Sequence, residues 1–119
     1  MTHTIKAVGP YSAYRKSGNL IFISGQLPLD PNINAIISNN IEDQAEQSLK
    51  NLRTLLEEQN LDMSAIVKTT VFLADIKDFD AMNKIYSSYF ESPYPARSAF
   101  QVAALPKGAL IEIEAIAQV

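Results

Sequence analysis

The chain has 119 residues, 47% of them apolar, and a formal net charge of −3 at pH 7. These values predict one globular domain over residues 1–119, because single domains usually contain about 100–200 residues. The chain lacks cysteine, and His3 is its one histidine. This composition excludes disulfides, thiolate catalysis, cysteine–zinc and iron–sulfur sites, histidine-based triads and multi-histidine metal sites.

The charge and the hydropathy of the chain indicate which partners it can bind and where in the cell it is expected. Lysine and arginine are dispersed, with Arg15-Lys16 as the one adjacent pair. Nucleic-acid binding usually needs a basic stripe, so the charge argues against a nucleic-acid partner. Apolar runs are far shorter than a membrane span, and the N-terminal segment lacks the apolar region of a secretory signal. We therefore expect a cytoplasmic protein with no membrane association.

The N-terminal third has the pattern of a hairpin followed by a loop. Tyr11–Lys16 and Leu20–Ser24 are predicted strands, joined by the turn Ser17-Gly18-Asn19. In the loop, Asp30-Pro31-Asn32-Ile33-Asn34 lacks the glycine and terminal glutamate of a calcium loop, so no metal site is predicted. Asn34 is expected to adopt a left-handed conformation, which asparagine tolerates well.

An apolar stripe at helical spacing predicts a helix over Ile41–Gln59. Asn40 is the expected N-cap, because its side chain can accept hydrogen bonds from the first turn. Asn60 can end the helix in the left-handed conformation.

The C-terminal half predicts one strand, one helix and two further strands. The strand covers Ile66–Ala74, and the helix is capped by Asp78 and runs to about Phe90. The last two strands cover Ala96–Ala103 and Leu110–Gln118. The element order is therefore ββαβαββ, an α+β fold with two helices packed on one face of a single sheet.

Alternation in the last two strands places charged residues on one predicted face. Arg97 shares a side with Ala99, and Glu112 shares a side with Glu114, opposite the plainly apolar side chains. Two helices cover one face of a sheet, and this mixed face is too apolar for solvent. We therefore predict a homo-oligomer with sites at the subunit junctions.

Arg97 and Glu112 are the first candidate site residues. Small neighbours leave room around the Arg97 guanidinium, whose planar donors match a carboxylate. Glu112 lies between two isoleucines, where a partly dry pocket can raise a carboxyl pKa and allow acid or base catalysis. A structural ion pair of Arg97 with Glu112 or Glu114 is an equally good interpretation for Arg97. For Glu112, the pattern alone favours an ion pair with Arg97 or Lys68.

Further polar candidates lie at the ends of predicted elements. Gly25 allows a ligand to approach the backbone closely. Ser24 has no nearby histidine base, so it is expected to bond a substrate or cap the turn rather than act as a nucleophile. The pattern alone gives Tyr11 and Asn83 no role beyond surface or capping residues.

Several separated blocks resemble one known family. The first is Pro95-Ala96-Arg97-Ser98-x-Phe100-x-Val102-x-x-Leu105-Pro106, followed by Ile111-Glu112-Ile113-Glu114-Ala115. Upstream blocks are Gly9-Pro10-Tyr11, Ile23-Ser24-Gly25-Gln26-Leu27-Pro28 and Val67-Lys68-Thr69-Thr70-Val71-Phe72-Leu73. Together they resemble the signature of the Rid (reactive intermediate deaminase, YjgF-like) family, deaminase subgroup, from about Ile5 to Ala117.

The resemblance implies a chorismate-mutase-like fold, a homotrimer with clefts between subunits, and an enzyme that needs no cofactor or metal. It implies metabolite damage control: hydrolysis of 2-aminoacrylate, 2-iminopropanoate and 2-iminobutanoate to 2-oxo acids and ammonia. Arg97 would grip the substrate carboxylate, and Glu112 would position or activate water and move protons. The cleft would be lined by Ser24, Gly25, Tyr11 and Asn83.

The sequence departs from the deaminase subgroup at one position, and two other functions are alternatives to imine hydrolysis. Ala99 occupies a position where cysteine is common in the deaminase subgroup, so a thiol there cannot be required for hydrolysis here. The first alternative is a non-catalytic protein of the same fold that binds or senses 2-oxo acids. The second is a translation-inhibiting ribonuclease, against which the acidic charge argues.

Overall fold

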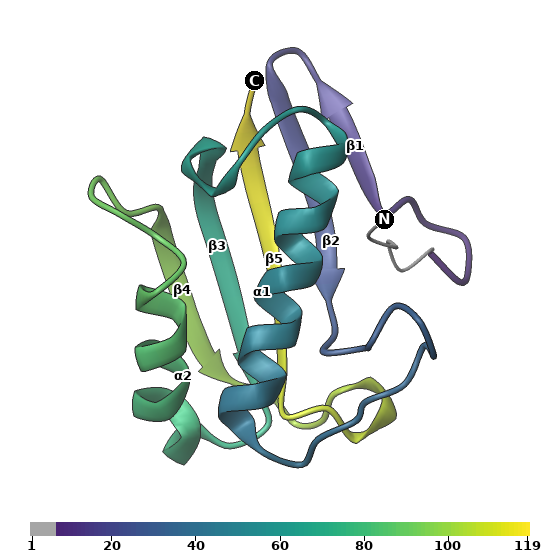
Figure 1. The fold of residues 1–119 in the computed structure, drawn as a ribbon, viewed down its shortest axis with the longest axis vertical. Coiled ribbons are helices and arrows are strands. Elements are labelled where there is room, and N and C mark those ends of the chain that lie inside the picture. The colour runs from purple at the N-terminus through teal and green to yellow at the C-terminus, as the bar shows by residue number, and fades with distance from the viewer. Residues whose placement is uncertain (1–6) are drawn as a thin grey trace.

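One five-stranded sheet and two helices form the structure, a computed structural model that describes residues 7–119 (Figure 1). The elements are β1 Tyr14–Ser17, β2 Leu20–Gln26, α1 Ile41–Glu58, β3 Ile66–Leu73, α2 Phe79–Ser87, β4 Ala96–Gln101 and β5 Ile111–Gln118. The predicted order ββαβαββ is confirmed. His3, and the N-terminal segment in which no secretory signal is predicted, lie outside the described residues.

The sheet has the strand order β1-β2-β5-β3-β4. All neighbours are antiparallel except β3 and β4, which are parallel. Parallel strands need a crossover connection, and α2 supplies it on the same side of the sheet as α1 (Figure 1). Both helices therefore cover one face, as predicted, and no helix of the described residues covers the other.

Local capping signals position the turns. Asn40 caps α1, because its side chain accepts hydrogen bonds from the backbone amides of the first turn. Asn34 and Asn60 have positive φ values of 53° and 60°, as predicted. Asp78 precedes α2 without a side-chain capping bond, whereas Asp75 caps the short 3-10 turn before it. The cap of this segment therefore lies three residues earlier than predicted.

Three elements are shorter than predicted by two or more residues. β1 begins at Tyr14 rather than Tyr11, because a tight turn joins the Tyr11 amide to the Gly9 carbonyl at 2.9 Å. α2 ends at Ser87 rather than Phe90, since 3-10 bonds tighten the next turn. β4 also ends two residues early.

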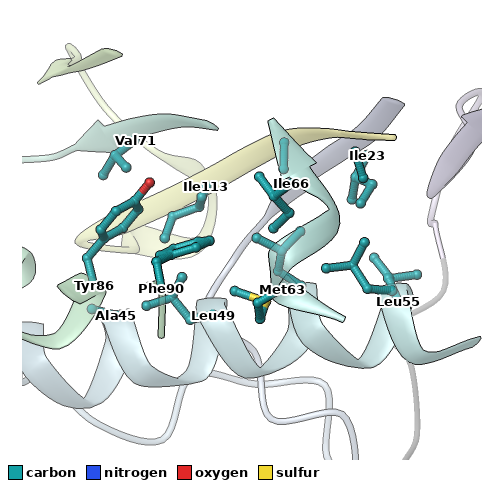
Figure 2. Close-up of a cluster of buried hydrophobic side chains, with 14 of the residues drawn as sticks. Ile23, Ala45, Leu49, Leu55, Met63, Ile66, Val71, Tyr86, Phe90 and Ile113 are labelled. Atoms are coloured by element: carbon teal, nitrogen blue, oxygen red, sulfur yellow. The ribbon is translucent and has the colours of Figure 1, made fainter. Parts of the chain in front are cut away.

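The hydrophobic core lies between the helices and the sheet (Figure 2). α1 buries a continuous apolar stripe against β2 and β5, which is the face that its helical spacing predicts. The fully buried apolar residues of α1 are Ala45, Leu49, Leu52 and Leu56. No helix within residues 7–119 combines the length and apolar character needed to cross a bilayer.

A buried amide on α1 holds the loop that follows β2. The Asn51 side chain donates to the backbone carbonyls of Leu27 at 3.1 Å and Leu29 at 2.9 Å. It also accepts a hydrogen bond of 2.9 Å from Gln47. This loop follows β2, which ends with Ser24, Gly25 and Gln26, so Asn51 anchors the chain directly after two candidate site residues.

We predict that Asn51→Ala lowers the free energy of unfolding by roughly 2–4 kcal/mol, because two loop carbonyls lose their partners. Urea unfolding would measure the change. Lys50→Ala, an exposed substitution on the same helix, should stay within about 0.5 kcal/mol of the parent chain. Equal losses in the two variants would contradict the anchoring role.

Candidate active site

Arg97 lies on the edge strand β4 and points toward α2. Its register partner on β3 is Thr69, which is fully buried under the helices. The Arg97 Nη1 donates a hydrogen bond of 2.6 Å to the Asn83 Oδ1. The guanidinium carbon lies 4.7 Å from the centre of the Tyr86 ring and 5.4 Å from that of Phe79. Two predicted site residues, Arg97 and Asn83, therefore touch each other.

Glu112 lies on the opposite face of the sheet. It pairs in register with Phe72, and Phe72 pairs in turn with Phe100. The rings of Phe72 and Phe100 meet edge to face, with centroids 5.6 Å apart, and Phe100 is 45% exposed on the uncovered side. Neighbouring register partners point the same way, so Glu112 shares this side.

The prediction that Arg97 and Glu112 share one face of the chain is therefore wrong. Alternation fixes which residues of β4 lie together but not which set faces the helices. The apolar character of Phe100 favours the helix side, whereas α2 presents the rings of Phe79 and Tyr86 there and leaves room for a long polar side chain. Within one chain, the same geometry excludes the ion pairs of Arg97 with Glu112 or Glu114 that the sequence left open.

Arg97 consequently keeps an uncompensated charge. Within residues 7–119 its partners are a neutral amide and two aromatic faces, and it forms no ion pair. A guanidinium carries five N–H donors, of which Asn83 takes one. A half-buried cation with free donors is suited to bind a small carboxylate.

The Glu112 carboxylate lies against Gly25. A Cβ atom at Gly25 would overlap the Glu112 carboxylate, so the missing side chain makes this contact possible. The pairing of β2 with β5 shifts register between Ile23 and Gln26, around Ser24 and Gly25. Such an irregularity re-aims local groups and is common beside active sites.

Burial raises the pKa of the Glu112 carboxyl, and the nearby negative charge of Glu114 raises this pKa further. Desolvation disfavours the charged carboxylate, and a like charge has the same effect. The group can therefore hold a proton at a higher pH than a solvated glutamate. This property suits a residue that both donates and accepts protons.

Ser24 and Tyr11 lie on the same side as Gly25. The Ser24 hydroxyl donates a 2.6 Å hydrogen bond to the Ser12 carbonyl, which ties the strand to the preceding segment. Tyr11 is 55% exposed. Both residues border an open hollow of about 530 Å³ over the uncovered face, and both line a smaller one of about 100 Å³ with Gly25.

The six predicted site residues thus fall into two groups. We call Arg97 and Asn83, with the rings of Phe79 and Tyr86, the arginine half. The second set, the glutamate half, comprises Glu112, Gly25, Ser24 and Tyr11. Among the described residues, no three His, Cys, Asp or Glu side chains gather as a metal site.

Phe79 and Tyr86 are not among the site residues that the sequence predicts. As aromatic residues at helical spacing, they are expected on the apolar side of the second helix. The available signal was their spacing with Asn83, which places residues 79, 83 and 86 on one helical stripe. That stripe becomes informative once Arg97 is known to face the helix.

Comparisons with known proteins support one family. A family model described as endoribonuclease L-PSP matches residues 1–119. Human 2-iminobutanoate/2-iminopropanoate deaminase is 50% identical over 93% of this chain and 81% of its own. A Rid-family protein of Yersinia pestis superposes with a TM-score of 0.95 at 42% identity, covering 98% of this chain and 94% of that one. Escherichia coli TdcF with bound serine gives 0.91 at 38% identity, with the same coverage.

The raised pKa of Glu112 predicts a pH-dependent cost to stability. The folded chain holds the Glu112 proton more tightly than the unfolded chain, so this contribution to stability falls as pH rises through the titration. Glu112→Gln removes the cost. We expect a higher free energy of unfolding than in the parent chain at pH 7, and no difference below about pH 4, where both states are protonated.

Urea unfolding across this pH range would measure the gap. Glu91→Gln removes an exposed loop carboxylate and should change stability by less than about 0.5 kcal/mol at any of these pH values. A gap between Glu112→Gln and the parent chain that does not vary with pH would contradict the prediction.

Proposed function

The chain belongs to the Rid family, whose family model is described as endoribonuclease L-PSP, and on this premise we propose that it hydrolyses small 2-imino acids. The products are a 2-oxo acid and ammonia, as the name of the human deaminase indicates for its own substrates. The observation that carries the proposal is the half-buried Arg97 guanidinium, which has only neutral partners in the described chain.

The arginine half would bind the substrate carboxylate. Asn83 fixes one edge of the guanidinium, and its other N–H donors can form two parallel bonds to a carboxylate. Bound serine in the related TdcF supports this assignment, because serine carries a carboxylate next to a nitrogen-bearing carbon, as a 2-imino acid does. Ala99, directly across from Val71 on the helix side, adds no polar group to the strand face that carries Arg97.

The glutamate half would carry the proton transfers. Protonated Glu112 gives its proton to the imine nitrogen, and water forms a bond to the imine carbon while the C=N electron pair moves to nitrogen. Glu112 takes a proton from the added water and passes it to the amine. The C–N bond then breaks, ammonia leaves, and the hydroxyl proton returns to Glu112 as the C=O bond forms.

Ser24, Tyr11 and Gly25 would line the pocket around the reacting carbon. The Ser24 hydroxyl already donates to Ser12, so it can accept a hydrogen bond from the substrate. Tyr11 is exposed, so its ring and hydroxyl are accessible to a ligand. The imine is intrinsically labile, so orientation by these groups supplies much of the rate gain.

A complete site needs two copies of the chain. We propose a homotrimer in which the arginine half of one copy meets the glutamate half of the next. The opposite placement of the halves on the sheet supports a head-to-tail arrangement, which closes into a ring. The number three comes from the family resemblance. We also propose that the protein clears reactive imines in the cytoplasm.

The two alternatives remain distinct in their chemistry. The family description names an endoribonuclease, and an RNA substrate would need many cations to neutralise its phosphates. The net charge of −3 favours a small substrate over RNA. A protein that binds 2-oxo acids without turnover would use Arg97 but would not need Glu112.

The first test measures pyruvate release while a serine dehydratase generates 2-aminoacrylate. We expect the protein to accelerate release, and Arg97→Ala to lower kcat/KM on the order of 10²–10³-fold, since truncating one member of a buried charged pair costs about 2–5 kcal/mol. Arg53→Ala is the matched control, because Arg53 also lies over a tyrosine ring, that of Tyr89.

Unchanged activity in Arg97→Ala would remove this residue from the mechanism. Cleavage of RNA by the purified protein, lost in Arg97→Ala, would favour the ribonuclease. Binding of 2-oxobutanoate without any acceleration would favour the sensing protein.

A second test asks whether the two halves come from different copies. Arg97→Ala and Glu112→Gln chains carry different affinity tags, are co-expressed, and are purified through both tags. Every mixed trimer then has one junction where an intact Arg97 meets an intact Glu112, so about one third of the parent activity should return. Activity no higher than that of the separate variants would place both residues in one chain.

A further inference from the structure

Three residues of α2 form a continuous stripe against Arg97. Phe79, Asn83 and Tyr86 are spaced four and three residues apart, so they lie on one side of the helix. The Arg97 guanidinium is bonded to the central amide and faces a ring on either side of it. The shorter of the two ring distances, 4.7 Å, is that to Tyr86.

Tyr86 is itself fixed at its hydroxyl. Its side chain is 5% exposed, and its hydroxyl shares a 2.7 Å hydrogen bond with the hydroxyl of Thr69, which is fully buried. Thr69 lies on β3 directly across from Arg97. The hydrogen bond therefore ties the helix residue under Arg97 to the strand beside Arg97.

A second aromatic ring supports Tyr86. Phe90 stands next to it, with ring centroids 4.6 Å apart and a 36° tilt (Figure 2). The figure shows the Tyr86 hydroxyl turned toward the strand that carries Val71, which is β3. Tyr86 thus has contacts at its tip and on its ring, and little freedom to rotate.

This environment keeps the ring neutral. Burial raises the pKa of the Tyr86 hydroxyl, against the lowering effects of the Thr69 hydrogen bond and the Arg97 charge. A neutral ring attracts a cation through its electron-rich face without cancelling the charge. Arg97 is therefore oriented while its full positive charge stays available to a ligand.

We propose that Tyr86, anchored by Thr69, is a positioning residue that holds the Arg97 guanidinium for a substrate carboxylate. This inference rests on the proposed function, which gives Arg97 the carboxylate. Because Arg97 would grip the carboxylate in the ground state and the transition state alike, loss of its positioning raises KM more than it lowers kcat. Loss of folded protein would instead lower apparent kcat at an unchanged KM.

The experiment compares three variants. Tyr86→Leu removes the ring face, and we expect KM to rise about tenfold, the size of one partly buried cation–π contact. Tyr86→Phe keeps the ring and loses the hydroxyl, and we expect a rise of about threefold. Tyr89→Leu is the matched control, because Tyr89 has a ring under Arg53 and a hydroxyl bonded to Glu46.

A second measurement does not depend on turnover. Calorimetric titration with 2-oxobutanoate gives a dissociation constant for each variant, and we expect the same order: Tyr86→Leu weakest, Tyr86→Phe intermediate, Tyr89→Leu equal to the parent. If Tyr86→Leu does not fold, Tyr86→Phe and Thr69→Val replace it. Each should weaken binding about threefold, and the double variant no more than either one.

The outcomes separate this inference from the proposed function. An unchanged KM and dissociation constant in Tyr86→Leu would overturn the positioning role, as would equal weakening in Tyr89→Leu. A parent protein that hydrolyses imines normally would leave the function standing in that case. Binding of 2-oxobutanoate that depends on Tyr86, in a protein without hydrolase activity, would support the positioning role and refute the function.

Discussion

The site depends on one electrostatic condition: groups without charge hold Arg97. A carboxylate in place of Asn83 would attract the guanidinium more strongly, but it would neutralise the charge and occupy donors that a ligand needs. An amide oxygen and two aromatic faces give weaker attraction and fix the orientation. The helix side of β4 is therefore built to present a cation rather than to satisfy it.

In the glutamate half, the charged group is also left without a compensating partner among the described residues of its own chain. Glu112 is partly desolvated beside Gly25, with Glu114 adding a like charge, so its charged form is disfavoured. Neither half is optimal for the stability of a single chain, since each leaves a polar group without its best partner. Departures from local optimisation of this kind are expected at functional sites, where the missing partner is a ligand or another subunit.

Local signals in the sequence predicted most of the fold, because helix periodicity, asparagine caps and turn residues act within a few positions. Asn40 and Asn60 are examples. The orientation of Arg97 was not predictable in this way, since it depends on the register of β4 against β3. The contact of Gly25 with Glu112 depends on an irregular pairing between β2 and β5. The candidate residues are therefore predictions from the sequence, whereas their division into two halves required the structure.

This division constrains how copies could assemble. A partner related by a twofold axis meets one patch of the chain with the same patch of its own. The two halves lie on opposite faces of the sheet, so one such partner would not complete both. A ring gives each copy two neighbours, one for each half. The uncovered face also exposes Phe22 by 43% and Phe100 by 45%, and an apolar surface of this kind favours burial against a neighbour. The same contact would then bury the apolar surface of the sheet and complete the site.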